Sequence, residues 1–271
     1  MKKIIHYCWF GGNPLPESAI NCIESWKKYF PDYEIKEWNE SNFDVNCCNY
    51  IRQAYQNKKW AFVSDYARFW ILYHEGGLYF DTDVEVIKSF SDIVQTGPFM
   101  GCEMGGEYGT EVAVAPGLGL GAEPGMHLYK QILDFYQNKT FLKENGQIDQ
   151  TTVVEYTTSI LKSHGWKTED TLQTIGEVTI YPTEYFCPIN YITGVKNITS
   201  ETRSIHHYAA SWHSKADEQI VKIGRFCIKY LGPIWGKRVA HTVDLPYRIK
   251  SKLDAMGVKK TLKVIAEKIF R

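Results

Sequence analysis

The chain has 271 residues, of which 44% are hydrophobic, 14% are aromatic and 23% are charged, with a formal net charge of zero. This length predicts one large domain, or one domain with an appendage, and the apolar content is ample for a core. No apolar run approaches the roughly 18–20 residues of a membrane span. His6 interrupts the apolar stretch that follows Lys2 and Lys3, so we expect a strand there rather than a signal peptide.

The charge is divided unevenly along the chain. Residues 1–214 contain 17 Lys or Arg and 26 Asp or Glu, whereas residues 215–271 contain 14 and 5. A basic tail of this kind is expected to meet an anionic surface. Nucleic acid is not the expected partner, because the tail has no nucleic-acid motif and the acidic main part would repel phosphates. The seven cysteines are scattered without a Cys-x-x-Cys pair, which predicts reduced cytosolic thiols and neither a disulfide framework nor a zinc site.

Periodicity predicts an alternation of strands and helices. In chain order we expect a strand at 4–7, a helix at 16–29 with Ile20, Ile23 and Trp26 on one face, and a strand at 33–38. Next come a helical region from 52–57, a helix at 61–74, a strand at 78–80 that continues at 83–87, helices at 126–136 and 151–164, and strands at 178–182 and 203–208. This order predicts an α/β fold, with a mostly parallel or mixed sheet and helices on both faces.

The most informative segment is residues 60–86. Its helix ends at Gly76-Gly77, an apolar strand follows, and Asp81-Thr82-Asp83 comes next. Side chains two apart in an extended strand point to one side, so Asp81 and Asp83 should aim two carboxylates at one point. Such oxygens suit Mn²⁺ or Mg²⁺, and a bound cation suits a diphosphate. The bare tripeptide is more often a solvated turn. Here it follows a strand end, where open α/β sheets place ligands.

Three segments resemble glycosyltransferase family 32, which includes capsular and exopolysaccharide transferases, fungal mannosyltransferases and the large clostridial glucosylating toxins. They are residues 3–12 (KIIHYCWFGG), 64–86 (SDYARFWILYHEGGLYFDTDVEV) and 204–212 (SIHHYAASW). The resemblance covers about residues 1–214 and implies a GT-A catalytic domain with a mixed central sheet flanked by helices. The Thr-Gly-Pro segment common in the family is not evident, and residues 115–121 occupy its place.

The resemblance also implies roles for single residues. Trp9 would contact the nucleotide base, Asp65 and Arg68 the donor sugar, Asp81 the ribose and the metal side, and Asp83 the metal directly. Without the family, Trp9 is read more simply as a core tryptophan. Asp65 and Arg68, three apart on a helix, are then an ordinary salt bridge.

The third segment supplies further candidates. His206 or Ser211 would contact the metal or the diphosphate, and Trp212 would cap the phosphate. Adjacent strand residues point to opposite faces, so only one of His206 and His207 faces the site, and we favour His206. Its imidazole would favour Mn²⁺. A strand histidine is, however, more often a structural residue.

The function implied is a metal-dependent hexosyltransferase that retains the anomeric configuration. A nucleotide sugar such as a UDP-hexose or UDP-N-acetylhexosamine would donate its sugar to a hydroxyl of a bacterial surface polysaccharide intermediate. In many such systems this acceptor is lipid-linked. The expected location is the cytoplasm, peripheral to the inner face of the plasma membrane.

Two alternative functions are an aspartate-nucleophile phosphatase and a non-catalytic carbohydrate-binding protein. The phosphatase motif requires Thr or Val where Glu85 stands, and a carbohydrate-binding protein needs no paired Asp81 and Asp83.

Residues 215–271 are predicted to form a basic, mainly helical C-terminal segment. Apolar residues recur at helical spacing among lysines, and 226–235 is an apolar stretch broken by Lys229 and Gly232-Pro233. A membrane-docking amphipathic appendage and a helix packed on the core with a solvated basic face are equally weighted alternatives. The repeating apolar positions are Ile249, Leu253, Met256, Leu262, Ile265 and Ile269.

Overall fold

The computed structural model describes residues 1–106, 109–144, 146–209, 215–251, 253 and 257. The chain forms two compact units. The first comprises Met1–Met104, Glu111–Ile189 and Lys196–Ala209, and the second comprises Gly105–Thr110, Asn190–Val195 and Ala210–Arg271. Two short loops from the middle of the chain therefore group with the C-terminal segment, which the sequence did not predict. The boundary after residue 214 stays a prediction.

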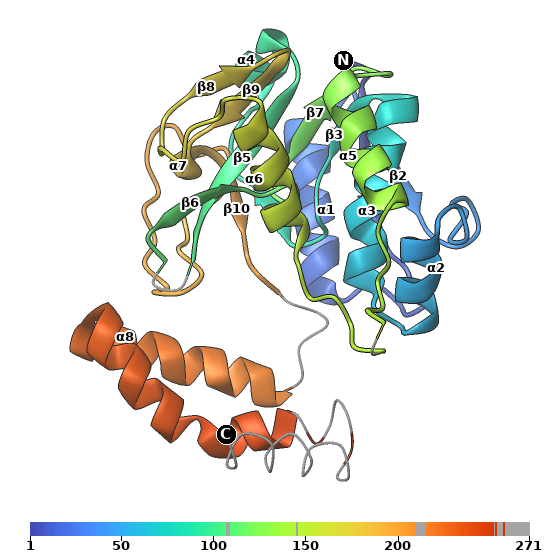
Figure 1. Cartoon of the computed structure of the whole chain (residues 1–271). Coiled ribbons are helices and arrows are strands. Elements are labelled where there is room, and N and C mark those ends of the chain that lie inside the picture. Colours follow the sequence, from blue (N-terminus) through green and yellow to red (C-terminus); the bar gives the residue numbers. More distant parts are fainter. Residues whose placement is uncertain (107–108, 145, 210–214, 252, 254–256, 258–271) are drawn as a thin grey trace. The chain divides into compact units, whose positions relative to one another are not determined.

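The first unit is built on a mixed eight-stranded sheet of order β2-β1-β3-β7-β5-β9-β8, with β6 paired to β5 (Figure 1). β1 is parallel to β2 and β3, and β5 is parallel to β9, while β7 is antiparallel to both of its neighbours. A separate two-stranded sheet pairs β4 with β10. The strands are β1 Ile4–Cys8, β2 Glu34–Trp38, β3 Gly77–Tyr79, β4 Val84–Val86, β5 Phe99–Gly105, β6 Glu111–Val114, β7 Leu120–Ala122, β8 Gln173–Ile175, β9 Val178–Tyr181 and β10 Ser204–His206.

Helices cover both faces of the sheet, and each face has its own apolar core. One core takes side chains from α2, α3, α5 and α6, and the other takes them from α1, α4 and α7. The helices of this unit are α1 Glu17–Tyr29, α2 Asn49–Gln56, α3 Trp60–Glu75, α4 Ser91–Thr96, α5 His127–Gln137, α6 Val153–Ser163 and α7 Thr183–Phe186. The predicted mixed α/β architecture with flanking helices is confirmed.

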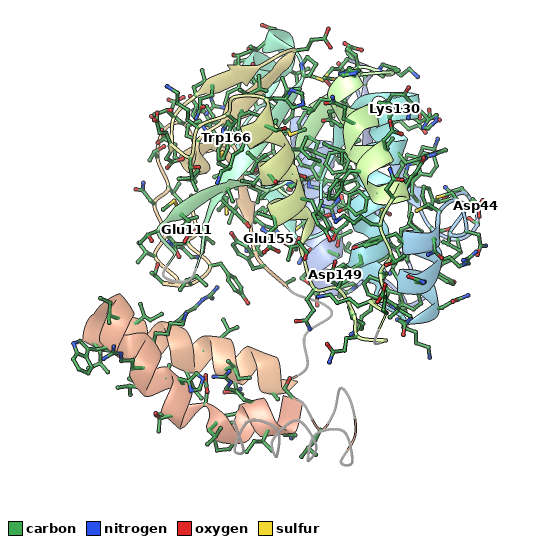
Figure 2. The ribbon with its side chains drawn as sticks, viewed as in Figure 1. Asp44, Glu111, Lys130, Asp149, Glu155 and Trp166 are labelled. Carbon is green, nitrogen blue, oxygen red and sulfur yellow. The ribbon has the colours of Figure 1, made fainter. Side chains whose placement is uncertain are left out.

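Local chemistry explains which face α1 buries and where α6 begins. α1 buries Ala19, Cys22, Ile23 and Trp26, while Ile20, which we expected on the same face, is 45% exposed. α6 begins with a capping box, in which Thr152 N–H donates to Glu155 at 2.8 Å and Glu155 N–H donates to the Thr152 hydroxyl at 3.3 Å. Figure 2 labels Glu155 in this first turn.

Gly76 and Gly77 turn the chain from α3 directly into β3. Gly76 has φ 68°, and its N–H donates to the Leu72 carbonyl at 2.9 Å. Gly77 has φ 94°, and a Cβ atom there would lie 2.7 Å from the Ile4 carbonyl oxygen of β1. Both positions therefore require glycine. This reversal sets the place where β3 ends and the acidic motif begins.

The second unit contains α8, Lys215–Val243, which is interrupted at Gly232 by non-helical backbone (φ 74°, ψ 170°). Residues 245–251 are helical again. Within the described part of the chain, no helix is both long and apolar enough to cross a membrane.

Candidate functional site

The strand order brings several loops to one edge of the sheet. β1 and β3 are parallel, and two antiparallel pairings through β7 make β5 run in the same direction as β3. The residues after β1 and β3, the end of β5 and the approach to β7 therefore share an edge. These positions hold Trp9, Asp81, Glu103 and Gly117. Ligands bind at such carboxyl-terminal edges of open α/β sheets.

Asp81 and Asp83 converge through a turn and not through an extended strand. The Val84 N–H donates to the Asp81 carbonyl at 3.1 Å, so the chain bends between β3 and β4. Our expectation of a strand running from residue 83 was wrong at its start, as was the argument from strand alternation. The two carboxylates nevertheless gather with His206, because one ligand atom of each residue lies within 4.8 Å of the others.

Arg68 lies between two carboxylates. Its Nη2 is 3.0 Å from Asp65 Oδ1 and 3.2 Å from Asp81 Oδ1, and its guanidinium lies 5.1 Å from the centre of the Tyr79 ring. The Tyr79 hydroxyl donates to Asp81 Oδ1 at 2.9 Å. Asp65 and Arg68 thus form an intrahelical ion pair, the simpler of the two interpretations, but the pair is buried and extends to Asp81. An exposed helical salt bridge would have neither feature.

The site holds more negative than positive charge. Burial raises the pKa of Asp65 to about 7, Arg68 opposes this rise, and Asp81 adds to it. Removal of the buried Asp65 carboxyl from water is the largest cause of this shift, and Arg68 offsets only part of it. A divalent cation near Asp81 and Asp83 would relieve this imbalance.

Asp83 is held by β10 and the residues after it. Its Oδ1 lies 3.1 Å from His206 Nε2, and its Oδ2 accepts from the Ala209 N–H at 2.9 Å. Burial alone would raise the pKa of Asp83, but His206 and the Ala209 N–H lower it to about 2. Burial alone would lower the pKa of His206, but Asp83 raises it well above 6.5. His207 instead faces Glu85, with Nε2 2.9 Å from Oε2. The structure thus brings the imidazole of His206, and not that of His207, to the carboxylates of the acidic motif.

A second group of polar side chains adjoins His206 and was not predicted. The Tyr208 hydroxyl donates to Glu103 Oε2 at 3.0 Å and lies 2.9 Å from Cys187 Sγ. One ligand atom each of Glu103, Cys187 and His206 lies within 4.8 Å of the others. Burial raises the pKa of Glu103, while His206 and the Tyr208 hydroxyl oppose the rise. His206 Nδ1 is buried without a hydrogen-bond partner among the described residues.

Gly117 was also missed. The Asp81 N–H donates to the Gly117 carbonyl at 3.1 Å, and a Cβ atom at Gly117 would overlap Asp81 Oδ2 and lie 3.3 Å from Arg68 Nη1. The glycine-rich stretch at 115–121 was noticed in the sequence, but no pattern there indicated which glycine contacts the site.

Trp9 is half-buried on the loop after β1, where its Nε1 donates to the Asn13 carbonyl at 2.6 Å. A cavity of about 630 Å³ adjoins this loop, but Trp9 is not among its lining residues. The aromatic residues that line the cavity are Tyr55 and Trp60, whose ring centres are 5.0 Å apart. The other lining residues are Gly11, Gly12, Asn13, Glu40 and Lys58. Ser211 and Trp212, predicted to contact the metal or phosphate, lie outside the described residues.

Comparison with known proteins agrees with this site. Residues 16–100 match the family model described as "Glycosyltransferase sugar-binding region containing DXD motif". That range includes Asp65, Arg68, Asp81 and Asp83. The predicted enzyme class, a glycosyltransferase, is thereby confirmed. No curated protein matches the chain. Eight chains of solved structures match, among them "PaToxG Glycosyltransferase", which is 20% identical with a TM-score of 0.43 over 60% of this chain and 69% of that one.

Proposed function

We propose that this chain is a metal-dependent, retaining glycosyltransferase of the family 32 type, with a GT-A catalytic domain in residues 1–214. It transfers a hexose or N-acetylhexosamine from a UDP-sugar to a hydroxyl of a bacterial surface polysaccharide intermediate. The observation that supports this proposal best is the convergence of Asp81, Asp83 and His206 beside the buried Asp65–Arg68 pair. The family resemblance of residues 3–12, 64–86 and 204–212 supports the finer assignment.

The residues present fit a divalent cation. Asp81 and Asp83 offer carboxylate oxygens, His206 offers an imidazole nitrogen, and their ligand atoms are close enough to share one ion. This mixed set suits Mn²⁺ and also admits Mg²⁺. When bound, the ion neutralises the negative charge that develops on the leaving diphosphate. In this proposal Asp83 and His206 hold the ion, and Asp81 contacts it together with the ribose.

Asp65 and Arg68 position the donor sugar. The Asp65 carboxylate accepts hydrogen bonds from sugar hydroxyls, and the Arg68 guanidinium donates to sugar or phosphate oxygens through its planar fork. Asp81 and Tyr79 hold that guanidinium in place. No side chain is assigned as an enzymatic nucleophile. The acceptor hydroxyl therefore attacks the donor's front face, with the leaving phosphate taking its proton.

The nucleotide base is assigned to the loop after β1. Trp9 is the base contact implied by the family, and the adjoining cavity adds Trp60 and Tyr55 as aromatic surfaces. Trp60 and Arg68 lie eight residues apart on α3, which is about 12 Å along the helix axis at 1.5 Å per residue. That span suits a nucleoside diphosphate sugar with its base at one end and its sugar at the other. Ser211 and Trp212 are assigned to the diphosphate.

The test is a survey of nucleotide sugars with purified full-length protein, with and without Mn²⁺. We expect one UDP-sugar to raise the melting temperature and to be slowly hydrolysed, both only with metal. At a hundredfold excess over Kd, a bound donor adds about 2.7 kcal/mol of stability. Asp83→Asn should abolish both effects without loss of fold, and Glu85→Gln is the matched control.

Donor binding with no hydrolysis or transfer would indicate a carbohydrate-binding protein. Release of phosphate from simple phosphate esters would indicate a phosphatase.

The acceptor and the place of reaction follow from the same proposal. A lipid-linked glycan at the inner face of the plasma membrane would put the enzyme in the cytoplasm at a membrane surface. Extraction of acceptor from membranes of a polysaccharide-producing strain, followed by transfer of radiolabelled sugar, tests this part. Label recovered only in water-soluble glycan would contradict the lipid-linked acceptor.

A further inference from the structure

The second unit contains a helical hairpin. α8 has two helical arms joined at Gly232 (Figure 1). A Cβ atom at Gly236 would lie 2.5 Å from Ile228 Cα and 2.6 Å from the Cys227 carbonyl oxygen, so the arms approach with their backbones almost in contact. Cys227 and Ala240 are buried, at 7% and 5% exposure. The hairpin thus has a closed inner side. We call residues 226–235 at its bend the hairpin tip.

The hairpin tip leaves its apolar side chains exposed. Fourteen large hydrophobic side chains are exposed in the described residues, and ten of them lie between Phe226 and Ile249. Exposed apolar residues stand on both arms of the hairpin, before and after Gly232. Those of the tip are Phe226 at 65%, Tyr230 at 65%, Leu231 at 48%, Ile234 at 57% and Trp235 at 63%. A concentrated apolar surface of this kind marks an interaction site.

Cationic side chains accompany these apolar groups. Residues 219–243 contain five Lys or Arg and no Asp or Glu. Lys229 Nζ lies 5.5 Å from the centre of the Tyr230 ring, and the Arg238 guanidinium lies 5.2 Å from that of Trp235. Lys222, Phe226 and Tyr230 follow at four-residue spacing, so they share one helix face. The partner must therefore be both anionic and able to cover apolar groups.

We propose that the hairpin tip docks on the surface of an anionic phospholipid bilayer. Trp235 and Tyr230 lie at headgroup level, because each ring has an apolar body and a polar group. Leu231 and Ile234 enter the acyl boundary, and Lys229 and Arg238 reach lipid phosphates. Contact between the hairpin tips of two copies of this chain would bring like charges together. A nucleic acid would leave Leu231 and Ile234 against a charged backbone. A bilayer of anionic lipid satisfies both features.

The docking proposal does not depend on the proposed reaction. A docking variant should hydrolyse the donor at the wild-type rate while failing to bind vesicles. If the protein binds vesicles but transfers no sugar, the docking proposal holds and the proposed reaction is wrong. Failure of one proposal is therefore distinguishable from failure of the other.

The experiment is flotation of the full-length protein with vesicles of phosphatidylcholine alone or mixed with phosphatidylglycerol, at low and high salt. We expect binding only to the mixed vesicles, decreasing as salt rises. Ile234→Ser with Trp235→Ser should weaken the vesicle partition constant by about tenfold or more. Lys229→Gln with Arg238→Gln should remove the preference for anionic lipid. Leu172→Ser, which changes an exposed hydrophobic residue of the first unit (59%), is the matched control and should have no effect.

Fluorescence gives a second readout that needs no disruptive variant. Of the tryptophans with described side chains, Trp235 is the exposed one. Brominated lipid should therefore quench part of the wild-type emission, and less of it in Trp235→Phe. Equal binding to both vesicle types, or unchanged binding of the Ile234/Trp235 variant, would overturn the proposal. So would a tip-dependent dimer or RNA complex formed without any vesicle binding.

Discussion

The backbone of Gly117 adjoins the carboxylate of Asp81. The Asp81 N–H donates to the Gly117 carbonyl at 3.1 Å, and a methyl group at residue 117 would overlap Asp81 Oδ2. Gly117→Ala should therefore displace Asp81, and with it the guanidinium of Arg68. We expect kcat/KM to fall by about 10²-fold, since a displacement of about 1 Å has that effect in a positioned site. Overpacking should also cost about 1–3 kcal/mol of stability.

Steady-state kinetics and a urea denaturation curve measure both effects of Gly117→Ala. The control is Gly105→Ala, because a Cβ atom at Gly105 meets nothing within 4 Å. Wild-type kinetics and stability in Gly117→Ala would mean that the neighbouring loop shifts freely, and Gly117 would then have no positioning role.

His206 and His207 form a natural matched pair, since each has Nε2 about 3 Å from a carboxylate oxygen. Only His206 shares its carboxylate with the proposed metal site. His206→Gln should raise the Mn²⁺ concentration required for half-maximal UDP binding by about tenfold or more, because even residues that support metal ligands have effects of that size. His207→Gln should leave it unchanged. Calorimetric titration of UDP at several Mn²⁺ concentrations measures this requirement. If the two variants required the same Mn²⁺ concentration, His206 would be excluded as a ligand.

Arg68→Lys separates positioning from charge. Lysine keeps the positive charge between Asp65 and Asp81 but lacks the planar fork that contacts both. We expect kcat/KM for the donor to fall by about 10²-fold, with little change in affinity for UDP and in melting temperature. Arg52→Lys, on the surface of α2, is the control. If Arg68→Lys changed only stability, Arg68 would be a structural ion pair and nothing more.

The sequence predicted the elements that have strong periodicity or special turn residues. α1, α3 and the Gly76-Gly77 reversal were expected, and β9 and β10 lie within the predicted late strands. The segment 99–122 gave no such pattern. β6 and β7 have only four and three residues, and the first four residues of β5 are all buried, so these strands offer little alternation to a sequence pattern.

The candidate site was predictable in part for the same reason. Asp65, Arg68, Asp81 and Asp83 stand in one continuous motif. Glu103 and Gly117 reach the site only because β3, β7 and β5 are neighbours in the sheet, and such a long-range pairing leaves no mark on a single sequence. The turn at Asp81 was misread, since three residues cannot reveal whether the backbone is extended or bent.

The base site offers a test of the aromatic residues near the β1 loop. Trp9→Leu should weaken binding of uridine monophosphate, as the family resemblance implies. Trp60→Leu should do so as well, because Trp60 lines the cavity beside Gly11 and a Cβ atom at Gly11 would lie 2.6 Å from Trp60 Nε1. Base stacking contributes about 1–3 kcal/mol, so the affinity should fall by about 5-fold to 150-fold. Trp235→Leu is the control. If Trp60→Leu binds normally, the cavity is not the base site.

His6 should make stability depend on pH. It is fully buried in β1, where Trp38 Nε1 donates to its Nδ1 at 3.0 Å and its Nε2 lies 3.0 Å from the Gly76 carbonyl. A proton on Nδ1 would oppose the Trp38 N–H. Burial lowers the pKa of His6 from 6.5 to about 4, with Lys36 and Lys2 adding to the change and the Gly76 carbonyl and Glu75 opposing it.

Since the unfolded chain takes up this proton near pH 6.5 and the folded chain only near pH 4, the stability contributed by His6 is lost as the pH falls across that window. The loss should reach about 3 kcal/mol. The measurement is the free energy of unfolding against pH for wild type and His6→Gln. The raised pKa of Asp65, about 7, gives the free energy of unfolding the opposite dependence on pH. Asp65 is present in both proteins, so its contribution cancels when wild type and His6→Gln are compared. We expect the cost of His6→Gln to be largest at pH 7 and to shrink by about 3 kcal/mol by pH 4. A cost that does not change with pH would mean that His6 takes up its proton equally in the folded and unfolded chains.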